Sequence, residues 1–92
     1  MAAAKLKTPL ENIRLDKWLW AARFFKTRKN ATEAINGGKV HLNGARVKPS
    51  RAIKPDDQLD ITRDGFRYHI TVLGFNDKRR PAKEAQQLYE ES

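Results

Sequence analysis

The fold of this chain is decided by residues 14–44, which read RLDKWLWAARFFKTRKNATEAINGGKVHLNG. In the first part of this stretch, apolar side chains recur at the spacing of one helix face, at Leu15, Leu19 and Ala22. This stripe predicts a helix over residues 15–24, with Trp18 flanking the stripe and Trp20 on another side of the helix.

A second helix is predicted over residues 28–36. Thr27 stands immediately before it, where a hydroxyl can accept a hydrogen bond from an otherwise unpaired backbone N–H of the first turn. The pair Gly37-Gly38 follows, and glycine ends helices because it tolerates positive φ. The apolar stripe of this second helix consists of Ala31, Ala34 and Ile35.

Short strands are predicted beyond the two helices. Asn43-Gly44 is a strong signal for a type I′ hairpin turn, in which both central residues need positive φ, and Asp64-Gly65 is a second such signal. Leu59 and Ile61 are expected to point inward. The predicted strands cover residues 39–42, 45–48, 58–63 and 66–73, with a connecting loop at 49–57.

The two ends of the chain have a different character. Residues 1–12 are small, polar and interrupted by proline, which predicts a flexible tail. A polar connection is expected near residues 74–80, and Pro81 suits the start of a final helix. An apolar stripe for that helix is provided by Ala82, Ala85, Leu88 and Tyr89. We therefore divide the chain into residues 1–12, a domain at 13–74, and a connection with a C-terminal helix at 75–92.

These elements predict the α+β class. Two N-terminal helices should pack on a small, mostly antiparallel sheet of about four strands, with one C-terminal helix added.

The charge of the chain is uneven. It carries 19 Lys and Arg residues against 11 Asp and Glu, a net charge of +8. Residues 14–54 hold 11 basic residues and only two acidic ones, Asp16 and Glu33, whereas residues 55–92 hold six basic and eight acidic residues. A basic half beside a mildly acidic half favours binding to a polyanion such as nucleic acid.

Several other functions are disfavoured. The chain has no cysteine and two histidines, His41 and His69, so neither a cysteine-ligated metal site nor a nucleophile–histidine set is expected. The acids around Asp56-Asp57 suit an ordinary turn better than a cation site. No apolar run reaches the length of a membrane span, and residues 1–12 do not read as a secretory signal. We expect a cytoplasmic protein without membrane contact, enzymatic activity, metal or cofactor.

The nucleic-acid signal comes from cations on adjacent elements, since Lys and Arg placed along two elements can follow a phosphate backbone. Aromatic side chains lie among them, and we expect at most one of Trp18, Trp20, Phe24 and Phe25 to touch RNA, because a core this small needs most of them. The candidate RNA-binding residues are Arg14, Lys17, Arg23, Lys26, Thr27, Arg28, Lys39, His41, Lys48 and Arg51.

At this point the sequence resembles a known family. The residues RLDKWLWAAR (14–23), KTR (26–28), GKV (38–40), NG (43–44) and KPS (48–50) are similar to the RNA-binding domain named after the fourth small-subunit ribosomal protein, also called the alpha-L motif. The resemblance covers residues 14–62. One departure is Asp56, where the family often has glycine, and Asp tolerates a left-handed conformation better than most residues.

A second resemblance extends to Ser92. The paired tryptophans, RRPA (79–82), EA (84–85) and LYEE (88–91) resemble a family of small bacterial heat-shock proteins that bind the large ribosomal subunit. Members tend to carry a basic C-terminal extension, which these residues lack. The resemblance implies recognition of ribosomal RNA on free large subunits and rescue of subunits blocked by a nascent chain carrying tRNA. We expect ribosomal RNA, the large subunit and tRNA or other structured nucleic acid as partners of a monomer.

Two alternatives remain at the level of the sequence. The predicted helix pair is also typical of a helix-turn-helix DNA-binding protein, although the second helix offers little beyond Arg28, Lys29 and Asn30 to read a groove. The domain also occurs as an RNA-binding appendage of RNA-modifying enzymes, which would apply if this chain were a fragment.

Overall fold

The computed structural model describes residues 13–75 and 81–91 of the chain. The expected flexible tail at 1–12 and most of the predicted connection before Pro81 lie outside these residues. The described elements are β1 (Ile13–Arg14), α2 (Leu15–Ala21), α3 (Arg28–Asn36), β2 (Val40–Leu42), β3 (Ala45–Arg46), β4 (Ala52–Ile53), β5 (Gln58–Arg63), β6 (Phe66–Val72), α4 (Ala82–Ala85), the 3-10 helix η1 (Gln86–Leu88) and β7 (Tyr89–Glu91).

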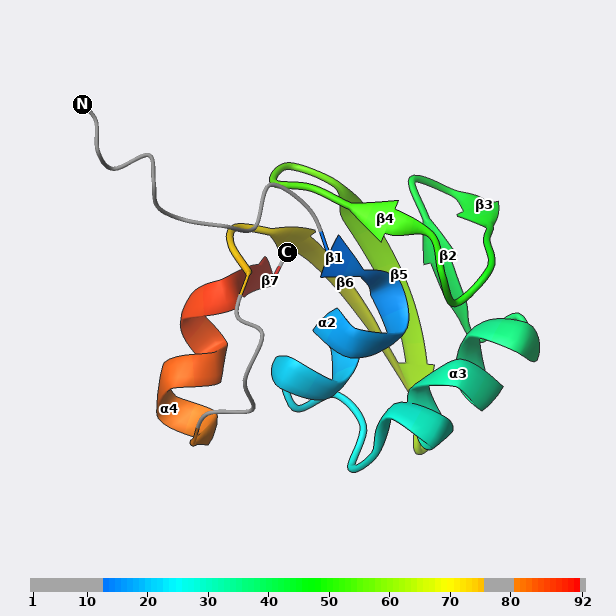
Figure 1. Ribbon diagram of the computed structural model, residues 1–92, viewed down its shortest axis with the longest axis horizontal. Helices are drawn as coiled ribbons and strands as arrows, with labels where there is room; N and C mark the ends of the chain where they lie inside the picture. Colours follow the sequence, from blue (N-terminus) through cyan, green and yellow to red (C-terminus); the bar gives the residue numbers. More distant parts are fainter. Residues whose placement is uncertain (1–12, 76–80, 92) are drawn as a thin grey trace.

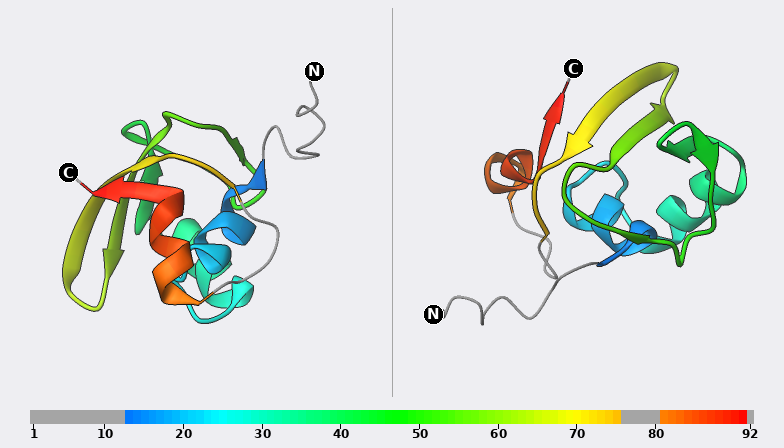
Figure 2. Two further views of the ribbon diagram at one scale, coloured as in Figure 1. Left: turned by 90° about the vertical axis from the view of Figure 1, so that its left-hand side faces the viewer. Right: turned by 90° about the horizontal axis from the view of Figure 1, so that it is seen from above.

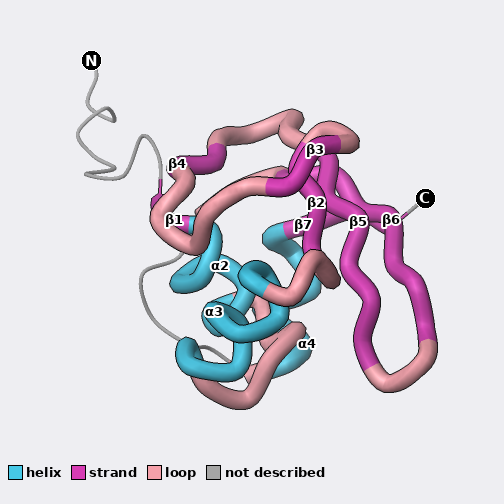
Figure 3. Tube along the Cα trace, turned by 90° about the vertical axis from the view of Figure 1, so that its right-hand side faces the viewer, coloured by secondary structure: helices cyan, strands magenta, loops and turns pink. Residues whose placement is uncertain are grey.

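The main sheet has five antiparallel strands in the order β3-β2-β5-β6-β7, and a separate two-stranded sheet joins β1 to β4. The helices α2, α3 and α4 lie on the same side of the main sheet (Figures 1 and 2). The trace in Figure 3 shows α2 and α3 side by side next to the sheet. This arrangement confirms the α+β class.

Both predicted hairpin turns are present. Asn43 and Gly44 have φ of 51° and 86°, and Asp64 and Gly65 have φ of 53° and 81°. Positive φ at both central residues gives a turn whose twist matches that of the two flanking strands. The left-handed conformation expected at Asp56 is also observed, with φ of 77°.

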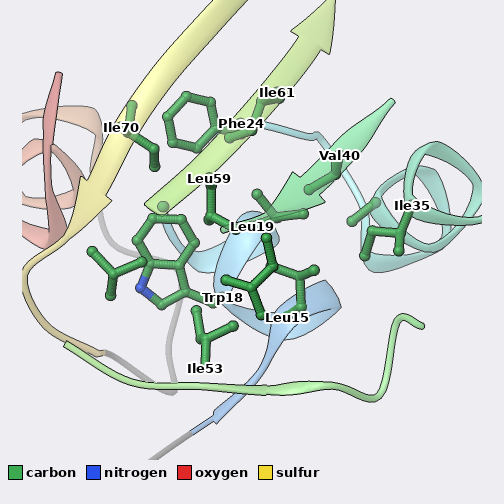
Figure 4. Packing of buried hydrophobic residues seen from close by; sticks show 14 of the residues in the cluster. Leu15, Trp18, Leu19, Phe24, Ile35, Val40, Ile53, Leu59, Ile61 and Ile70 are labelled. Atoms are coloured by element: carbon green, nitrogen blue, oxygen red, sulfur yellow. The ribbon is translucent and has the colours of Figure 1, made fainter. Parts of the chain in front are cut away.

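The core fills the space between the helices and the sheet. The side chains of α2 meet those of β5 and β6 there, and the fully buried Trp18 is among them (Figure 4). The indole N–H of Trp18 donates a hydrogen bond of 2.8 Å to the carbonyl of Gly74, so this buried polar group is satisfied. The expected inward residues Ala31, Ala34, Ile35, Leu59 and Ile61 are all buried.

The first helix is shorter than predicted. Helix α2 ends at Ala21, because the next turn breaks at Arg23, whose φ is 67°. The N–H of Phe24 then donates to the carbonyl of Leu19 at 3.0 Å, and the Phe24 ring stacks on Trp18 at a centroid distance of 6.2 Å. This sharp turn allows Phe24 to pack into the core, whereas a continued helix would not.

The C-terminal prediction was partly wrong. A helix does start after Pro81, but α4 has only four residues, and Tyr89 belongs to strand β7. Tyr89 pairs with Val72 on β6 and tilts its ring against Phe24 at a centroid distance of 4.8 Å. The edge of β6 carries backbone groups that need partners, and β7 supplies them as a fifth strand. Likewise, the loop predicted at 49–57 contains the short strand β4.

Candidate nucleic-acid interface

A buried carboxylate organises the N-terminal end of α2. The Asp16 residue is only 3% exposed, and its two oxygens accept hydrogen bonds from Arg14 at 3.2 and 3.0 Å, from Arg28 at 3.3 Å and from the Thr32 hydroxyl at 3.3 Å. We call these four residues the Asp16 cluster. The side chains of Arg14 and Arg28 remain 54% and 45% exposed, so each guanidinium is held from one side and open to solvent on the other.

The ionisation of Asp16 follows from this cluster. Burial alone would raise the pKa of the carboxyl, since it removes water from the charged form. Other interactions lower this pKa: the hydrogen bond and charge of Arg14, the charge of Arg28, and a hydrogen bond from the backbone N–H of Lys17. Together these interactions prevail, and the pKa of Asp16 lies below its usual value. The carboxylate is therefore charged at neutral pH and orients both arginines.

A turn at residues 48–51 places further cations beside the Asp16 cluster. The carbonyls of Pro49 and Arg51 accept hydrogen bonds from the N–H groups of Asp16 (3.2 Å) and Leu15 (2.9 Å). The turn is closed by a hydrogen bond from the N–H of Arg51 to the carbonyl of Lys48. Lys48 and Arg51 are both exposed, so the fold brings the predicted residues Arg14, Arg28, Lys48 and Arg51 into one region.

A second group of cations surrounds a cleft between the α2–α3 connection and the start of the β5–β6 hairpin turn. The cleft has a volume of about 660 Å³, and its lining includes Arg23, Phe25, Lys26, Asn30, Lys39 and Arg63. Three of the predicted RNA-binding residues therefore share this cleft. Thr27 lies next to it and caps α3, since its hydroxyl oxygen accepts the N–H of Asn30 at 3.0 Å.

The remaining two candidates are placed differently. Lys17 is half-buried on α2, directly after Asp16. His41 occupies the middle of β2 between the buried residues Val40 and Leu42, so its side chain points to the sheet face that turns away from the helices. On that face it lies in register with Arg46 and Asp60. The structure thus separates His41 from the cations on the helices.

Two arginines have structural contacts that sequence patterns did not indicate. Arg46 donates a hydrogen bond of 2.8 Å to the carbonyl of Asn36, at the C-terminal end of α3. Arg63 donates one of 2.6 Å to the carbonyl of Phe24, and its guanidinium lies 5.4 Å from the centre of the Tyr68 ring. Asp16 was also not foreseen as an organising residue, although an isolated acid between cations was a visible signal.

The four aromatic residues on α2 and the α2–α3 connection differ in burial. Trp18 is fully buried and Phe24 is 5% exposed, so both belong to the core. Trp20 and Phe25 are partly buried, and Phe25 packs against the edge of the core from the cleft.

The acidic turn before β5 is structural. The carboxylate of Asp57 accepts a hydrogen bond of 2.9 Å from the N–H of Lys54 and one of 3.3 Å from the amide of Asn43. Among residues 13–75 and 81–91, no group of three or more His, Cys, Asp or Glu side chains is placed to hold a metal ion. None of the described helices is long and apolar enough to cross a membrane.

Several known proteins are similar to this chain in sequence and fold. The S4 domain model matches residues 13–59. Heat shock protein 15 of Escherichia coli is 49% identical over 84 residues, which cover 91% of this chain and 63% of that protein. The trimeric structure of Vibrio cholerae Heat Shock Protein 15 superposes with a TM-score of 0.86 at 49% identity, covering 89% of this chain and 83% of that one.

A more distant group of relatives bears another name. The RQC P-site tRNA stabilizing factor of Bacillus subtilis is 32% identical over 79 residues, which cover 84% of this chain and 88% of that protein. This chain spans 63% of the length of the Escherichia coli relative, so part of that protein has no counterpart here.

Proposed function

The chain belongs to the Heat shock protein 15 family and carries its S4 domain, and from this premise we propose that it recognises structured ribosomal RNA on free large ribosomal subunits. Its role would be to rescue subunits that are stalled with a nascent chain, during heat shock or related stress, in the cytoplasm. It acts by binding and performs no catalysis. The S4 domain match and the names of the relatives support RNA binding and association with the ribosome.

The observation that carries the proposal is the Asp16 cluster. Folded RNA displays phosphates at distinctive spacings, and a protein can recognise that shape only with cations held at fixed positions. The buried carboxylate fixes the guanidiniums of Arg14 and Arg28 while half of each side chain stays exposed. A planar guanidinium can then pair with a phosphate through two hydrogen bonds. Lys48 and Arg51 extend the same basic region.

The name of the more distant relatives supports a tRNA partner as well. Those proteins are named for stabilising tRNA in the P-site, and a site that binds phosphates by shape suits either RNA. We propose that tRNA on the stalled subunit is a secondary contact.

A monomer remains our proposed state in solution, and light scattering would measure it, since the related Vibrio cholerae protein was solved as a trimer.

The proposal is tested by sedimentation. Tagged protein in a bacterial lysate is separated on a sucrose gradient before and after heat shock. We expect the protein with free large subunits, and in smaller amounts with small subunits and translating ribosomes. A distribution over all ribosomal fractions in proportion to their RNA would leave a general RNA-binding protein and refute the large-subunit assignment. Competition between duplex DNA and structured RNA in the same lysate would expose a DNA-binding function.

A further inference from the structure

The cleft beside the α2–α3 connection is shaped for a small occupant. Its volume of about 660 Å³ falls in the range of roughly 300 to 1,000 Å³ that small-molecule sites occupy. Its walls come from the consecutive α2–α3 connection and α3, from Lys39 just before β2, and from the end of β5 with the hairpin turn, which is more distant in sequence. Hydrogen bonds from Lys39 N–H to the Ala34 carbonyl (2.9 Å) and from Thr62 N–H to the Lys39 carbonyl (2.8 Å) join α3 to β5.

Arg63 braces the cleft from the sheet side. Its Nη1 donates to the carbonyl of Phe24 at 2.6 Å and approaches that of Arg23 at 3.5 Å. Its guanidinium also lies over the ring of Tyr68. These contacts hold the connection at the point where Arg23 takes a φ of 67°, a costly conformation for a residue with a side chain. The cleft is therefore a built feature, held open by tertiary contacts.

The chemistry of the lining combines an aromatic ring with cations. Phe25 is half-buried and lines the cleft, and within the described part of the chain its ring stacks on no other ring, unlike that of neighbouring Phe24. Four basic side chains line the cleft, against the two acidic ones of Glu33 and Asp64. Lys26 and Lys39 are exposed, so their ammonium groups are available at the rim.

We propose that this cleft receives a single unpaired nucleotide of the bound RNA. The base lies against the ring of Phe25, and the phosphates on either side of it meet Lys26 and Lys39. Proteins recognise RNA beyond its shape mainly through unpaired bases that stack on aromatic side chains, and an open ring among cations provides for such stacking. This inference rests on the proposed RNA-binding function and adds to it a preference for RNA with an extruded base.

The test compares two RNA hairpins that differ only in one bulged adenosine. Stacking of one base predicts that the protein binds the bulged hairpin about 5- to 100-fold more tightly than the fully paired one. Phe25→Leu keeps the apolar packing but removes the aromatic ring, so this preference should fall to about 2-fold or less, with little change in affinity for the paired hairpin. Phe25→Tyr should retain the preference.

A matched control is available on the adjacent hairpin. Phe66 is 66% exposed and lies outside the cleft lining, so Phe66→Leu makes the same chemical change and should leave the preference unaltered. Thermal unfolding of each variant checks that the fold is retained. NMR amide shifts that distinguish the two hairpins should gather at residues 23–26, 39 and 62–64.

The outcomes of the hairpin experiment distinguish the nucleotide site from the RNA-binding function on which it rests. Tight, salt-dependent binding of both hairpins with equal affinity would keep the RNA-binding function and overturn the nucleotide site. Equal losses from Phe25→Leu and Phe66→Leu would also overturn it. Failure to bind either hairpin would overturn the nucleotide site, while the large-subunit assignment is decided separately by sedimentation.

Discussion

Replacing Asp16 with asparagine tests whether the buried carboxylate organises the RNA-binding surface. The side chain is 5% exposed and accepts charge-assisted hydrogen bonds, which contribute about 1.5 to 3 kcal/mol each. Asparagine has the same shape but turns an N–H₂ group toward donors. Because Arg14 and Arg28 are about half exposed, their charges regain water, which reduces the loss. We expect Asp16→Asn to lower the free energy of unfolding by about 2 to 4 kcal/mol.

The effect on RNA binding distinguishes two roles for this carboxylate. If Asp16 only weakened the positive field, its neutralisation would add one net positive charge and tighten RNA binding. If it orients Arg14 and Arg28, the variant loses two positioned cations, and the affinity should fall about 10-fold, or 1.4 kcal/mol. Fluorescence anisotropy with a structured ribosomal RNA fragment measures the difference, at a temperature where both proteins are folded.

Glu33→Gln provides the matched control for this experiment. Glu33 is the other acid of the basic segment, is exposed on α3 and lines the cleft, so its neutralisation makes the same charge change at the RNA-binding surface without disturbing the Asp16 cluster. We expect equal or tighter RNA binding and a stability change within about 0.5 kcal/mol. If Asp16→Asn bound RNA as tightly as the wild type or Glu33→Gln, the orienting role of Asp16 would be refuted.

The difference in stability between the wild type and Asp16→Asn should depend on pH. The folded state lowers the pKa of Asp16 below the unfolded value of 3.8, so the carboxylate contributes its stability fully above that value. This contribution is lost as the pH falls through the lower pKa of the folded protein. Denaturant unfolding should show a constant difference between wild type and Asp16→Asn near neutral pH, which shrinks once the pH drops below about 4. A difference that persisted unchanged into strong acid would contradict the assignment.

Further expectations concern other parts of the surface. If about four to six phosphates are neutralised, the logarithm of the affinity should fall with the logarithm of salt with a slope of roughly −3 to −5, and a flat response would contradict a basic binding face. Arg28→Ala should weaken RNA binding by about 1 to 3 kcal/mol, whereas Arg67→Ala on β6 should do much less; equal losses in the same binding assay would mean that the face is misplaced. Thr27→Ala removes the cap at the Asn30 N–H and should lower stability by about 1 kcal/mol in denaturant titration; an unchanged midpoint would show that water replaces the cap.

Features that depend on near neighbours in the chain could be predicted from the sequence. Helix α3 has the predicted bounds, because Thr27 caps its start and Gly38, with a φ of 79°, follows its end. The Asn43-Gly44 turn was predictable for the same reason, since its backbone angles suit these two residues and few others. Strand β5 also begins and ends where its pattern and the following turn require.

The shape of the basic surface depended on the path of the whole chain. Residues 14–54 could be identified as basic, but no local pattern showed that Arg28 would meet Asp16, or that Arg63 would reach the carbonyl of Phe24. Nor did the sequence alone separate His41 from the cations on the helices, because the face a strand residue occupies depends on which side the helices cover.

The sequence by itself determined the α+β class, the two helices, the hairpin turns and the basic character of the first half. All of these follow from backbone preferences and side chains a few residues apart. Tertiary structure alone decided that Tyr89 would extend the sheet as part of β7 and that Asp16 would hold two arginines. The physical reason is that an open strand edge and a buried charge must find partners, and those partners are whichever groups the folded chain brings near.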